Sequence, residues 1–397
     1  MTPTGKIPIQ NWMRTEEIVT LFRAFPDHKD NLRFVGGCVR DTLLGLQGFD
    51  IDLATPLTPE AVIDLLKKAN IVVIPTGLAH GTVTAVINKI PFEITTLRID
   101  TETYGRHAQV SFTDRWDEDA KRRDFTFNAL YLDYDGELYD LFHGQKDLEA
   151  GRVKFIGNPL DRIQEDYLRI LRYFRFLAYY GREQPLKKTL EACHALSPYL
   201  TTISGERIHK ELLTLLKASN PLNALQYMVS TSVFRVLFGF EPKFEYLRNI
   251  LEAEKKNQIE ASGLRRFYSI FKEFPAELHH ALKLFRFSNI EKKYLEKIHL
   301  ALDHHHWLLH KRLYYFGREV MIDVLLLEGE KSQIIQLAKS WKSSVFPVKG
   351  QHILNLGIPK GPQISKKLSK IEEWWVDHEC RPTLNECLDY AKSLMKQ

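Results

Sequence analysis

The chain has 397 residues, of which 44% are hydrophobic and 26% are charged, and its formal net charge is +5. This composition excludes a disordered or fibrous chain and indicates a soluble protein of more than one domain, because single cores stop growing below this length. No apolar run approaches the roughly 20 residues that cross a bilayer, so we expect no membrane partner.

The first 150 residues alternate between short β-type runs and helical patterns. Asn88-Lys89 and Asp135-Gly136 predict tight hairpin turns. Together these patterns predict a small mixed sheet with helices on one side. The expected strands are 33–36, 50–54, 71–75, 82–87, 92–98, 129–134 and 138–140, and the expected helices are 15–25, 41–46 and 58–69.

After Gly151 the periodicity becomes helical and stays helical to the end of the chain. The sequence therefore predicts an α+β protein in which a sheet-containing region precedes an all-α region. The expected helices are 162–180, 186–196, 205–218, 221–229, 241–256, 263–271, 276–283, 290–307, 308–316, 319–327, 331–340, 349–356, 362–378 and 383–396.

The four cysteines are scattered along the chain, with no C-x-x-C pair among them. This pattern predicts neither a disulfide framework nor a zinc site, and it suits a reducing compartment. Residues 1–14 lack the apolar core of a signal peptide. We expect a cytoplasmic protein, and nothing in the sequence implies a protein partner.

The most informative stretch is Gly36-Gly37-Cys38-Val39-Arg40-Asp41, followed by Asp50-Ile51-Asp52. If 50–54 is a strand, the alternation of side chains places Asp50 and Asp52 on one face. Two carboxylates that point the same way can hold Mg²⁺. The glycine pair lets the backbone approach a triphosphate and offers N–H groups to its phosphates. Each part alone also fits an ordinary turn, but the combination in this order indicates phosphoryl transfer.

A second informative stretch is Lys121-Arg122-Arg123-Asp124. Arginines beside an aspartate fit a salt-bridged surface turn. A bidentate guanidinium is also a good ligand for a triphosphate. This stretch taken alone leaves both interpretations open.

A third informative stretch runs from Glu165 to Phe176 and reads as one helix. It fits an ordinary amphipathic helix with ion pairs, or a site that reads a base. Asp166 offers only acceptors and Arg169 only donors, which matches the amino group and adjacent ring nitrogen of cytosine and adenine. Uracil and guanine present the reverse polarity, so such a pair would accept CTP and ATP and reject UTP and GTP. The charged residues that recur every three positions, and would form a slanting stripe on a helix, are Asp166, Arg169, Arg172 and Arg175.

Residues from about 30 to 220 resemble one family, the class II tRNA nucleotidyltransferases or CCA-adding enzymes, within the polymerase-β-like nucleotidyltransferase superfamily. The motifs occur in the family's order and at near-family spacing, and residues 204–208 resemble a further family segment. The matching segments are FVGGCVRDTLLG, DID, TGLAHGTV, FEITTLR, RRDFTFNAL and EDYLRILRYFRF.

The resemblance implies roles for individual residues. Asp50 and Asp52 would bind Mg²⁺, and Glu93 would complete the metal site as a third catalytic carboxylate. Asp100 to His107, with Arg106, would form the flexible loop that helps the enzyme switch from adding C to adding A. Asp166 and Arg169 would template the base. The full set implied to bind the nucleotide is Gly37, Arg40, Arg123, Asp166, Arg169, Arg172 and Arg175.

The resemblance also implies an architecture and a reaction. A polymerase-β-like head at 1–150 would precede an elongated all-α neck at 151–220, body at 221–320 and tail at 321–397, with the tail gripping tRNA. The enzyme would add CCA to tRNA 3′ ends from CTP and ATP and release pyrophosphate.

Three alternatives remain open at the level of sequence. The first is an enzyme restricted to CC addition or to A addition. The loop-like segment 100–107 argues against the CC-restricted form only. A poly(A) polymerase is disfavoured by TGLAHGTV and FEITTLR. An RNA-binding protein with an inactive head is disfavoured by the presence of Asp50, Asp52 and both arginines of RRD.

Overall fold

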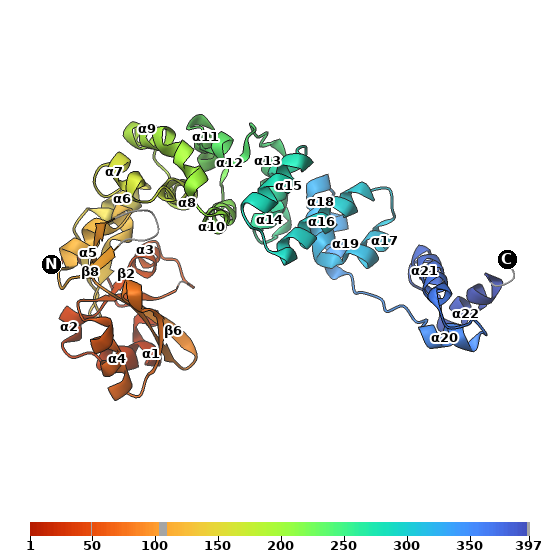
Figure 1. Cartoon of the computed structure of the whole chain (residues 1–397), viewed down its shortest axis with the longest axis horizontal. Helices are drawn as coiled ribbons and strands as arrows, with labels where there is room; N and C mark the ends of the chain where they lie inside the picture. The colour runs from red at the N-terminus through yellow and green to blue at the C-terminus, as the bar shows by residue number, and fades with distance from the viewer. Residues whose placement is uncertain (49, 103–108, 395–397) are drawn as a thin grey trace. The chain divides into compact units, whose positions relative to one another are not determined.

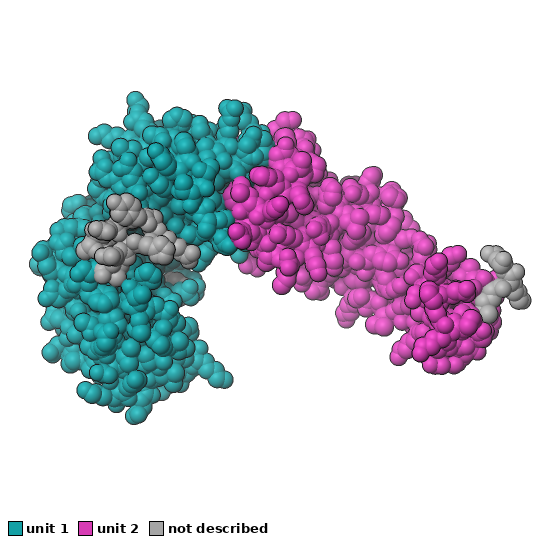
Figure 2. Space-filling view, viewed as in Figure 1, with its two compact units in different colours: residues 1–241 teal, residues 242–397 magenta. Residues whose placement is uncertain are grey.

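A computed structural model describes residues 1–48, 50–102 and 109–394 of the chain. The chain divides into two compact units, residues 1–241 and 242–397 (Figure 2). The finer boundaries expected near residues 150, 220 and 320 stay a prediction.

The first unit is built on an eight-stranded sheet with the strand order β1-β10-β9-β2-β3-β6-β5-β4 (Figure 1). Neighbouring strands are antiparallel except β3 and β6, which are parallel, so the sheet is mixed as predicted. A separate hairpin of β7 and β8 was not expected from the sequence. The strands are β1 (Gly5–Lys6), β2 (Arg33–Val35), β3 (Asp52–Thr55), β4 (Val72–Gly77), β5 (Thr82–Ile87), β6 (Ile90–Thr96), β7 (Arg98–Glu102), β8 (Gln109–Phe112), β9 (Leu130–Leu132) and β10 (Glu137–Asp140).

Local sequence signals explain the best-predicted part of this sheet. Asn88 and Lys89 both have positive φ, 51° and 68°, which is the conformation of a two-residue hairpin turn between β5 and β6. Helix α4 (Pro59–Lys68) begins after Thr58, whose hydroxyl accepts a hydrogen bond from the backbone N–H of Ala61. This helix packs on β4 and β5.

The remaining helices of the first unit fall into two groups along the chain (Figure 1). Those between and beside the strands are η1 (Asn11–Arg14), α1 (Glu16–Arg23), α2 (His28–Asn31), α3 (Gly37–Leu43), η2 (Leu78–His80), α5 (Trp116–Arg122), η3 (Thr126–Asn128) and α6 (Gly144–Ala150). Those that follow the sheet are α7 (Pro159–Glu165), α8 (Arg169–Tyr180), α9 (Lys187–Leu196), η4 (Ser197–Thr202), α10 (Gly205–Leu216), α11 (Leu222–Ser230) and α12 (Val233–Phe238).

The single helix expected over 162–180 is wrong, because the chain leaves helical geometry between α7 and α8. Asp166 is extended, with φ −154° and ψ 106°. Its carboxylate accepts a hydrogen bond from the backbone N–H of Leu168 at 3.1 Å. This local side-chain bond competes with the helical pattern, as Asp commonly does at turns and caps.

All the secondary structure of the second unit's described residues is helical. Its core holds a buried ionic cluster in which Glu254 accepts hydrogen bonds from Arg265 and Arg266, and Arg265 also pairs with Asp323. Helices α20 to α22 enclose a small apolar core of their own, which includes Trp375. The helices are α13 (Glu245–Asn257), α14 (Gly263–Phe271), α15 (Pro275–Leu284), α16 (Asn289–Asp303), α17 (Leu309–Phe316), α18 (Arg318–Glu328), α19 (Ser332–Ser340), α20 (Gly350–Asn355), α21 (Pro362–Asp377) and α22 (Leu384–Ser393).

The predicted order, a mixed-sheet region followed by a helical region, is confirmed. Among the helices of the described chain, none has the length and apolar character needed to span a bilayer.

Candidate active site

A cavity of about 590 Å³ lies in the first unit between the sheet and the helices that follow it. Nine of the ten residues predicted for the site line this cavity, although they come from segments far apart in the sequence. The exception is Asp50, which is exposed just before β3 and is not among the lining residues. The nine are Gly37, Arg40, Asp52, Glu93, Arg123, Asp166, Arg169, Arg172 and Arg175.

The glycine pair forms the sharp turn between β2 and α3. Gly36 has φ 70° and ψ −118°, a backbone conformation that residues with a side chain rarely adopt. A Cβ at this position would lie 3.7 Å from Nη1 of Arg123, so the turn also brings the backbone close to that arginine. Cys38 follows on α3 with its side chain fully buried, and burial raises the pKa of its thiol to about 12. It is therefore a packing residue, as expected.

The acidic wall of the cavity lies at the parallel pair of strands. Asp52 begins β3 and is the register partner of Glu93 on β6. Burial, followed by the negative charges of Glu93 and Asp50, raises the pKa of Asp52 to about 6, against the opposing effect of Arg123. The strand starts at Asp52 and not at Asp50, so the alternation argument for placing both aspartates on one face does not apply.

The donor set at this wall suits a magnesium ion. Mg²⁺ takes one or two protein carboxylates and completes its shell with phosphate oxygens and water. Within residues 1–48, 50–102 and 109–394 there is no group of three His, Cys, Asp or Glu side chains arranged to hold a metal. Asp52 and Glu93 are thus the neighbouring carboxylates that fit the ion, and Asp50 contributes negative charge from just outside the strand.

Two arginines of the opposite wall share one buried carboxylate, Asp119 on α5. Arg122 donates to Oδ1 of Asp119 at 2.8 Å, and Arg123 donates to Oδ2 at 3.0 Å. Tyr131 donates to the same Oδ2 at 2.7 Å. Burial alone would raise the pKa of Asp119, but Arg123 and Arg122 outweigh it and hold that pKa well below its usual range. Asp119 was not predicted as a site residue, although its spacing of three and four residues before Arg122 and Arg123 was a signal for ion pairs.

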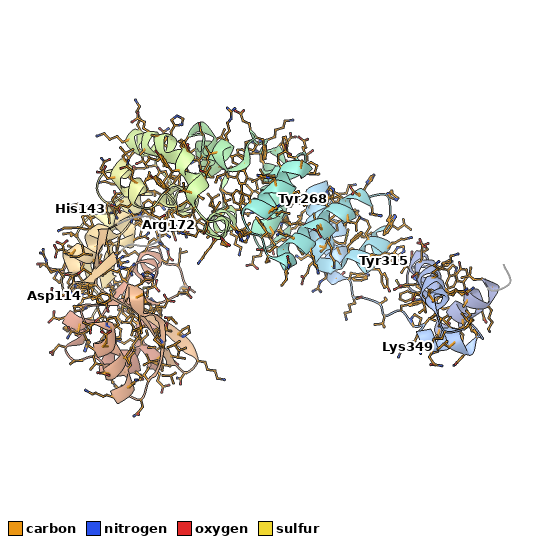
Figure 3. The ribbon with its side chains drawn as sticks, viewed as in Figure 1. Asp114, His143, Arg172, Tyr268, Tyr315 and Lys349 are labelled. Atoms are coloured by element: carbon orange, nitrogen blue, oxygen red, sulfur yellow. The ribbon has the colours of Figure 1, made fainter. Side chains whose placement is uncertain are left out.

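A buried chain of hydrogen bonds links the glycine turn to α8. Arg40 donates to Oδ1 of Asn128 at 2.8 Å, and the amide nitrogen of Asn128 donates to Asp124 at 2.9 Å. Arg172, labelled in Figure 3, donates to the other oxygen of Asp124 at 2.7 Å. Asn128 and Asp124 both line the cavity and were not predicted as site residues. Both lie in the RRDFTFNAL motif, but their partners Arg40 and Arg172 are 88 and 48 residues away, so local sequence does not reveal these bonds.

Arg172 and Arg175 converge on a second buried acid, Glu211 of α10. The Nε of Arg175 lies 2.7 Å from Oε2 of Glu211, and Nη1 of Arg172 lies 3.7 Å from Oε1. Arg172 and Arg175 of α8 therefore face the cavity, and Glu211 of α10 holds their guanidinium groups in place. Glu211 also went unpredicted.

Asp166 and Arg169 line the same cavity but do not form the side-by-side pair that the sequence predicted. Asp166 precedes α8 and pairs with Arg207 of α10, whose Nη2 lies 2.6 Å from Oδ2. Arg169 is the first residue of α8 and donates to the backbone oxygen of Arg162 at 2.8 Å. The premise that one helical turn separates them on a continuous helix is wrong. Their roles in reading a base remain a prediction, and Arg207 joins them as an unpredicted neighbour.

The segment expected to act as the C-to-A switching loop, Asp100 to His107 with Arg106, falls largely on residues 103–108, which lie outside the described part of the chain.

Comparison with known proteins assigns a class to this site. Residues 32–154 match the family described as "Poly A polymerase head domain", and residues 185–247 match "Probable RNA and SrmB- binding site of polymerase A". The first match covers strands β2 to β10, with the glycine turn and the acidic and arginine residues of the sheet region. The fold and the site thus define a nucleotidyltransferase with a polymerase-type head.

Full-length relatives narrow the class to one family. The human CCA tRNA nucleotidyltransferase 1, mitochondrial, is 36% identical over 95% of this chain and 90% of its own length. The CCA-adding enzyme of Lactococcus lactis subsp. cremoris (strain MG1363) is 32% identical over 93% and 94%. The chain belongs to the CCA-adding tRNA nucleotidyltransferases.

Solved structures agree with this assignment at the level of fold. The Bacillus stearothermophilus CCA-adding enzyme in complex with CTP superposes with a TM-score of 0.73 at 23% identity, covering 96% of this chain and 97% of that one. The Thermotoga maritima CCA-adding enzyme complexed with tRNA_CCA gives 0.65 at 20% identity, covering 100% of both chains.

The buried chain of hydrogen bonds predicts a pH-dependent stability. Burial opposes the charge of Asp124, but Arg172 and Asn128 outweigh it and lower its pKa to about 2. Its contribution is therefore complete above the ordinary aspartate pKa of about 3.9 and is lost as the pH falls towards 2. Asp124→Asn should cost about 2 kcal/mol in the free energy of unfolding at pH 7, because the partly exposed Arg172 loses a charge-assisted hydrogen bond.

Urea unfolding of wild type and D124N between about pH 7 and 3 measures this contribution, and the difference between them should shrink as the pH falls. Asp114→Asn, at an exposed aspartate labelled in Figure 3, is the matched control and should change little at any pH. A D124N difference that stays constant with pH would contradict the assignment.

Proposed function

We propose that this enzyme completes tRNA 3′ ends with CCA, using CTP and ATP and releasing pyrophosphate. The observation that carries the proposal is one cavity with neighbouring carboxylates on one wall and a fixed set of arginines on the other. Such a cavity suits a metal-bound triphosphate that reacts at its α-phosphate. Related structures hold a CCA-adding enzyme in complex with CTP, with ATP or with tRNA_CCA.

In the proposed reaction, the 3′-hydroxyl oxygen of the tRNA attacks the α-phosphorus of the nucleotide. A new phosphodiester bond forms, the bond to the bridging oxygen breaks, and pyrophosphate leaves with the electron pair while the hydroxyl proton is released. Asp52 and Glu93, with Asp50 beside them, would hold Mg²⁺. When bound, the ion would lower the pKa of the attacking hydroxyl and stabilise the leaving pyrophosphate.

The arginine wall would receive the triphosphate. Arg123 and Arg122 are held by Asp119, and Arg172 is held by Asp124, so their guanidinium groups need little rearrangement when phosphates arrive. Donors that are fixed before the reaction stabilise developing charge better than mobile ones. Gly37 and Arg40 would support the nucleotide from the glycine turn, and Arg175 from α8.

Selection of the base would fall to the end of the cavity formed by Asp166, Arg169 and Arg207. Asp166 presents acceptors and the two arginines present donors. An exocyclic amino group next to a ring-nitrogen acceptor, as in cytosine and adenine, satisfies this arrangement. Uracil and guanine would leave buried polar groups unpaired.

The helical second unit would bind tRNA by contacting the phosphate backbone and the shape of the RNA, because A-form RNA is recognised in this way. We also propose a cytoplasmic location. All four cysteines are free, which suits a reducing compartment. The human relative, in contrast, is named as mitochondrial, so recovery of the chain in the mitochondrial fraction would contradict a cytoplasmic location. Cell fractionation with an antibody to the native chain tests the location.

The reaction is tested with tRNA transcripts that end before CCA, after C and after CC. Each is incubated with single nucleoside triphosphates and with their mixture, and the 3′ ends are sequenced. We expect completion to CCA and no further addition. Transcripts that stop at CC, that accept only the last A, or that gain a run of A would indicate a CC-restricted enzyme, an A-restricted enzyme or a poly(A) polymerase respectively.

Removal of a proposed metal ligand should stop both C and A addition. Asp52→Ala removes a carboxylate from the shared metal site, and Asp50→Ala removes the charge beside it, so turnover should fall by at least about 10³-fold. Binding of tRNA, measured by filter retention, should persist. Asp64→Ala, at an exposed position in the middle of α4, is a control for a lost surface carboxylate. Near wild-type turnover of the D52A enzyme with Mg²⁺ would place the metal elsewhere.

Removal of the proposed base acceptor should relax nucleotide choice. Asp166→Ala leaves Arg169 and Arg207 without the acceptor that rejects uracil O4. A site built on specific hydrogen bonds holds roughly 10⁴-fold selectivity, so misincorporation of UTP should rise plainly while CTP addition falls. Single-nucleotide assays on one transcript measure both. Strict exclusion of UTP by D166A would mean that other residues read the base.

A further inference from the structure

A second cavity, of about 780 Å³, lies in the helical second unit between α16, the α17–α18 turn and the segment after α19. Four cations line it, namely Lys293, Lys297, Arg318 and Lys342, against one acid, Glu319. All four cations are exposed, and within the described part of the chain none lies within 4.0 Å of a carboxylate. The cavity therefore carries a net positive charge that the protein itself does not neutralise.

The same cavity contains an aromatic ring with no stacking partner. Trp341 is half-buried at its wall, and among the described side chains its indole packs against no other ring, whereas the other five tryptophans do. The tyrosines beside it are fixed, because Tyr294 donates to Asp323 at 2.9 Å and Tyr314 donates to a carboxylate of α21. A free indole face stands next to rigid aromatic walls.

A further cavity, of about 720 Å³, continues the positive charge past the start of α16. Its lining includes His280, Lys283, Arg286 and Lys292 and no acid. Lys292 lines this cavity, and the next residue, Lys293, lines the 780 Å³ cavity that contains Trp341. Cations thus extend over both sides of the first turns of α16, which is more than a single mononucleotide would engage.

We propose that these two cavities bind a strand segment of the RNA substrate in which one unpaired base stacks on Trp341. Single-stranded RNA is bound in this manner, with cations along the backbone and an aromatic ring under a base. The proposal rests on the tRNA substrate of the proposed function. It assigns the contact to the α15–α16 face and to the segment after α19.

The test uses the full-length chain and a tRNA transcript lacking CCA. Trp341→Ala should raise the Kd for tRNA about tenfold, the usual cost of losing one stacked base, whereas W341F keeps a ring and should stay within about threefold of wild type. The double variant Lys293→Ala with Lys297→Ala should weaken binding and lower the slope of log Kd against log salt by about 1 to 2. The matched control is K255A with K256A, two exposed lysines on α13.

Single-turnover CTP addition at saturating tRNA distinguishes a failure of the proposed CCA addition from a failure of the proposed RNA contact at Trp341. Wild type and all variants should retain the same rate and the same KM for CTP, because the substituted residues lie far along the chain from the nucleotide cavity. Failure of wild type to extend tRNA would overturn the proposed function. Normal extension with unchanged tRNA Kd in W341A and in the double lysine variant would overturn this inference alone.

A free nucleoside triphosphate also carries a base and phosphates, so it is the other ligand to test at the Trp341 cavity. Fluorescence of Trp341, read as the difference between wild type and W341F, should change with tRNA and not with ATP or CTP at millimolar concentration. A response to ATP or CTP together with unchanged tRNA affinity would assign the cavity to a mononucleotide and overturn the RNA proposal.

Discussion

The buried hydrogen bonds from Arg40 through Asn128 and Asp124 to Arg172 join the sheet region to the helices that follow it. Arg40, Asn128 and Asp124 are buried, so the loss of one partner would leave another buried polar group unpaired. Through Arg172 the chain continues to Glu211 on α10. These bonds therefore hold the glycine turn, the segment after α5 and the arginines of α8 in fixed positions relative to one another.

The same arrangement explains how a site so rich in arginine remains folded without substrate. The guanidinium groups of Arg122 and Arg123 share Asp119, and Arg175 pairs with Glu211. Each arginine has five N–H donors, so a carboxylate can hold it in place and leave donors directed at the cavity. The internal acids prevent mutual repulsion while the cavity still attracts a polyphosphate.

Sequence patterns predicted those parts of the molecule that depend on neighbouring residues. The β5–β6 turn at Asn88-Lys89 and the cap of α4 by Thr58 are local, and both were expected where the structure has them. The motifs also identified nine residues that line one cavity. The bonds that connect them were not predictable, because Asn128 reaches Arg40, Asp124 reaches Arg172 and Glu211 reaches Arg175 across long stretches of sequence.

Two predictions based on periodicity were wrong: the single helix 162–180 and the strand 50–54. Periodicity reports apolar spacing and does not report side-chain hydrogen bonds at the ends of elements. The break before α8 arises because the carboxylate of Asp166 bonds to a nearby backbone N–H and to Arg207, and such competition leaves the apolar pattern intact. The late start of β3 leaves Asp50 outside the strand. In both cases a charged residue at an element's end, where function is expected, departs from the regular structure.

The position of Cys38 has a consequence for the chemistry of oxidation. Its thiol lies within 3.6 Å of the backbone oxygen of Asp52, yet it is fully buried and its pKa is raised to about 12. Peroxide and electrophiles react with the thiolate, not the thiol. A cysteine that lies directly behind the strand of Asp52 is thus kept uncharged and inaccessible, and oxidants would reach it only after the head had opened.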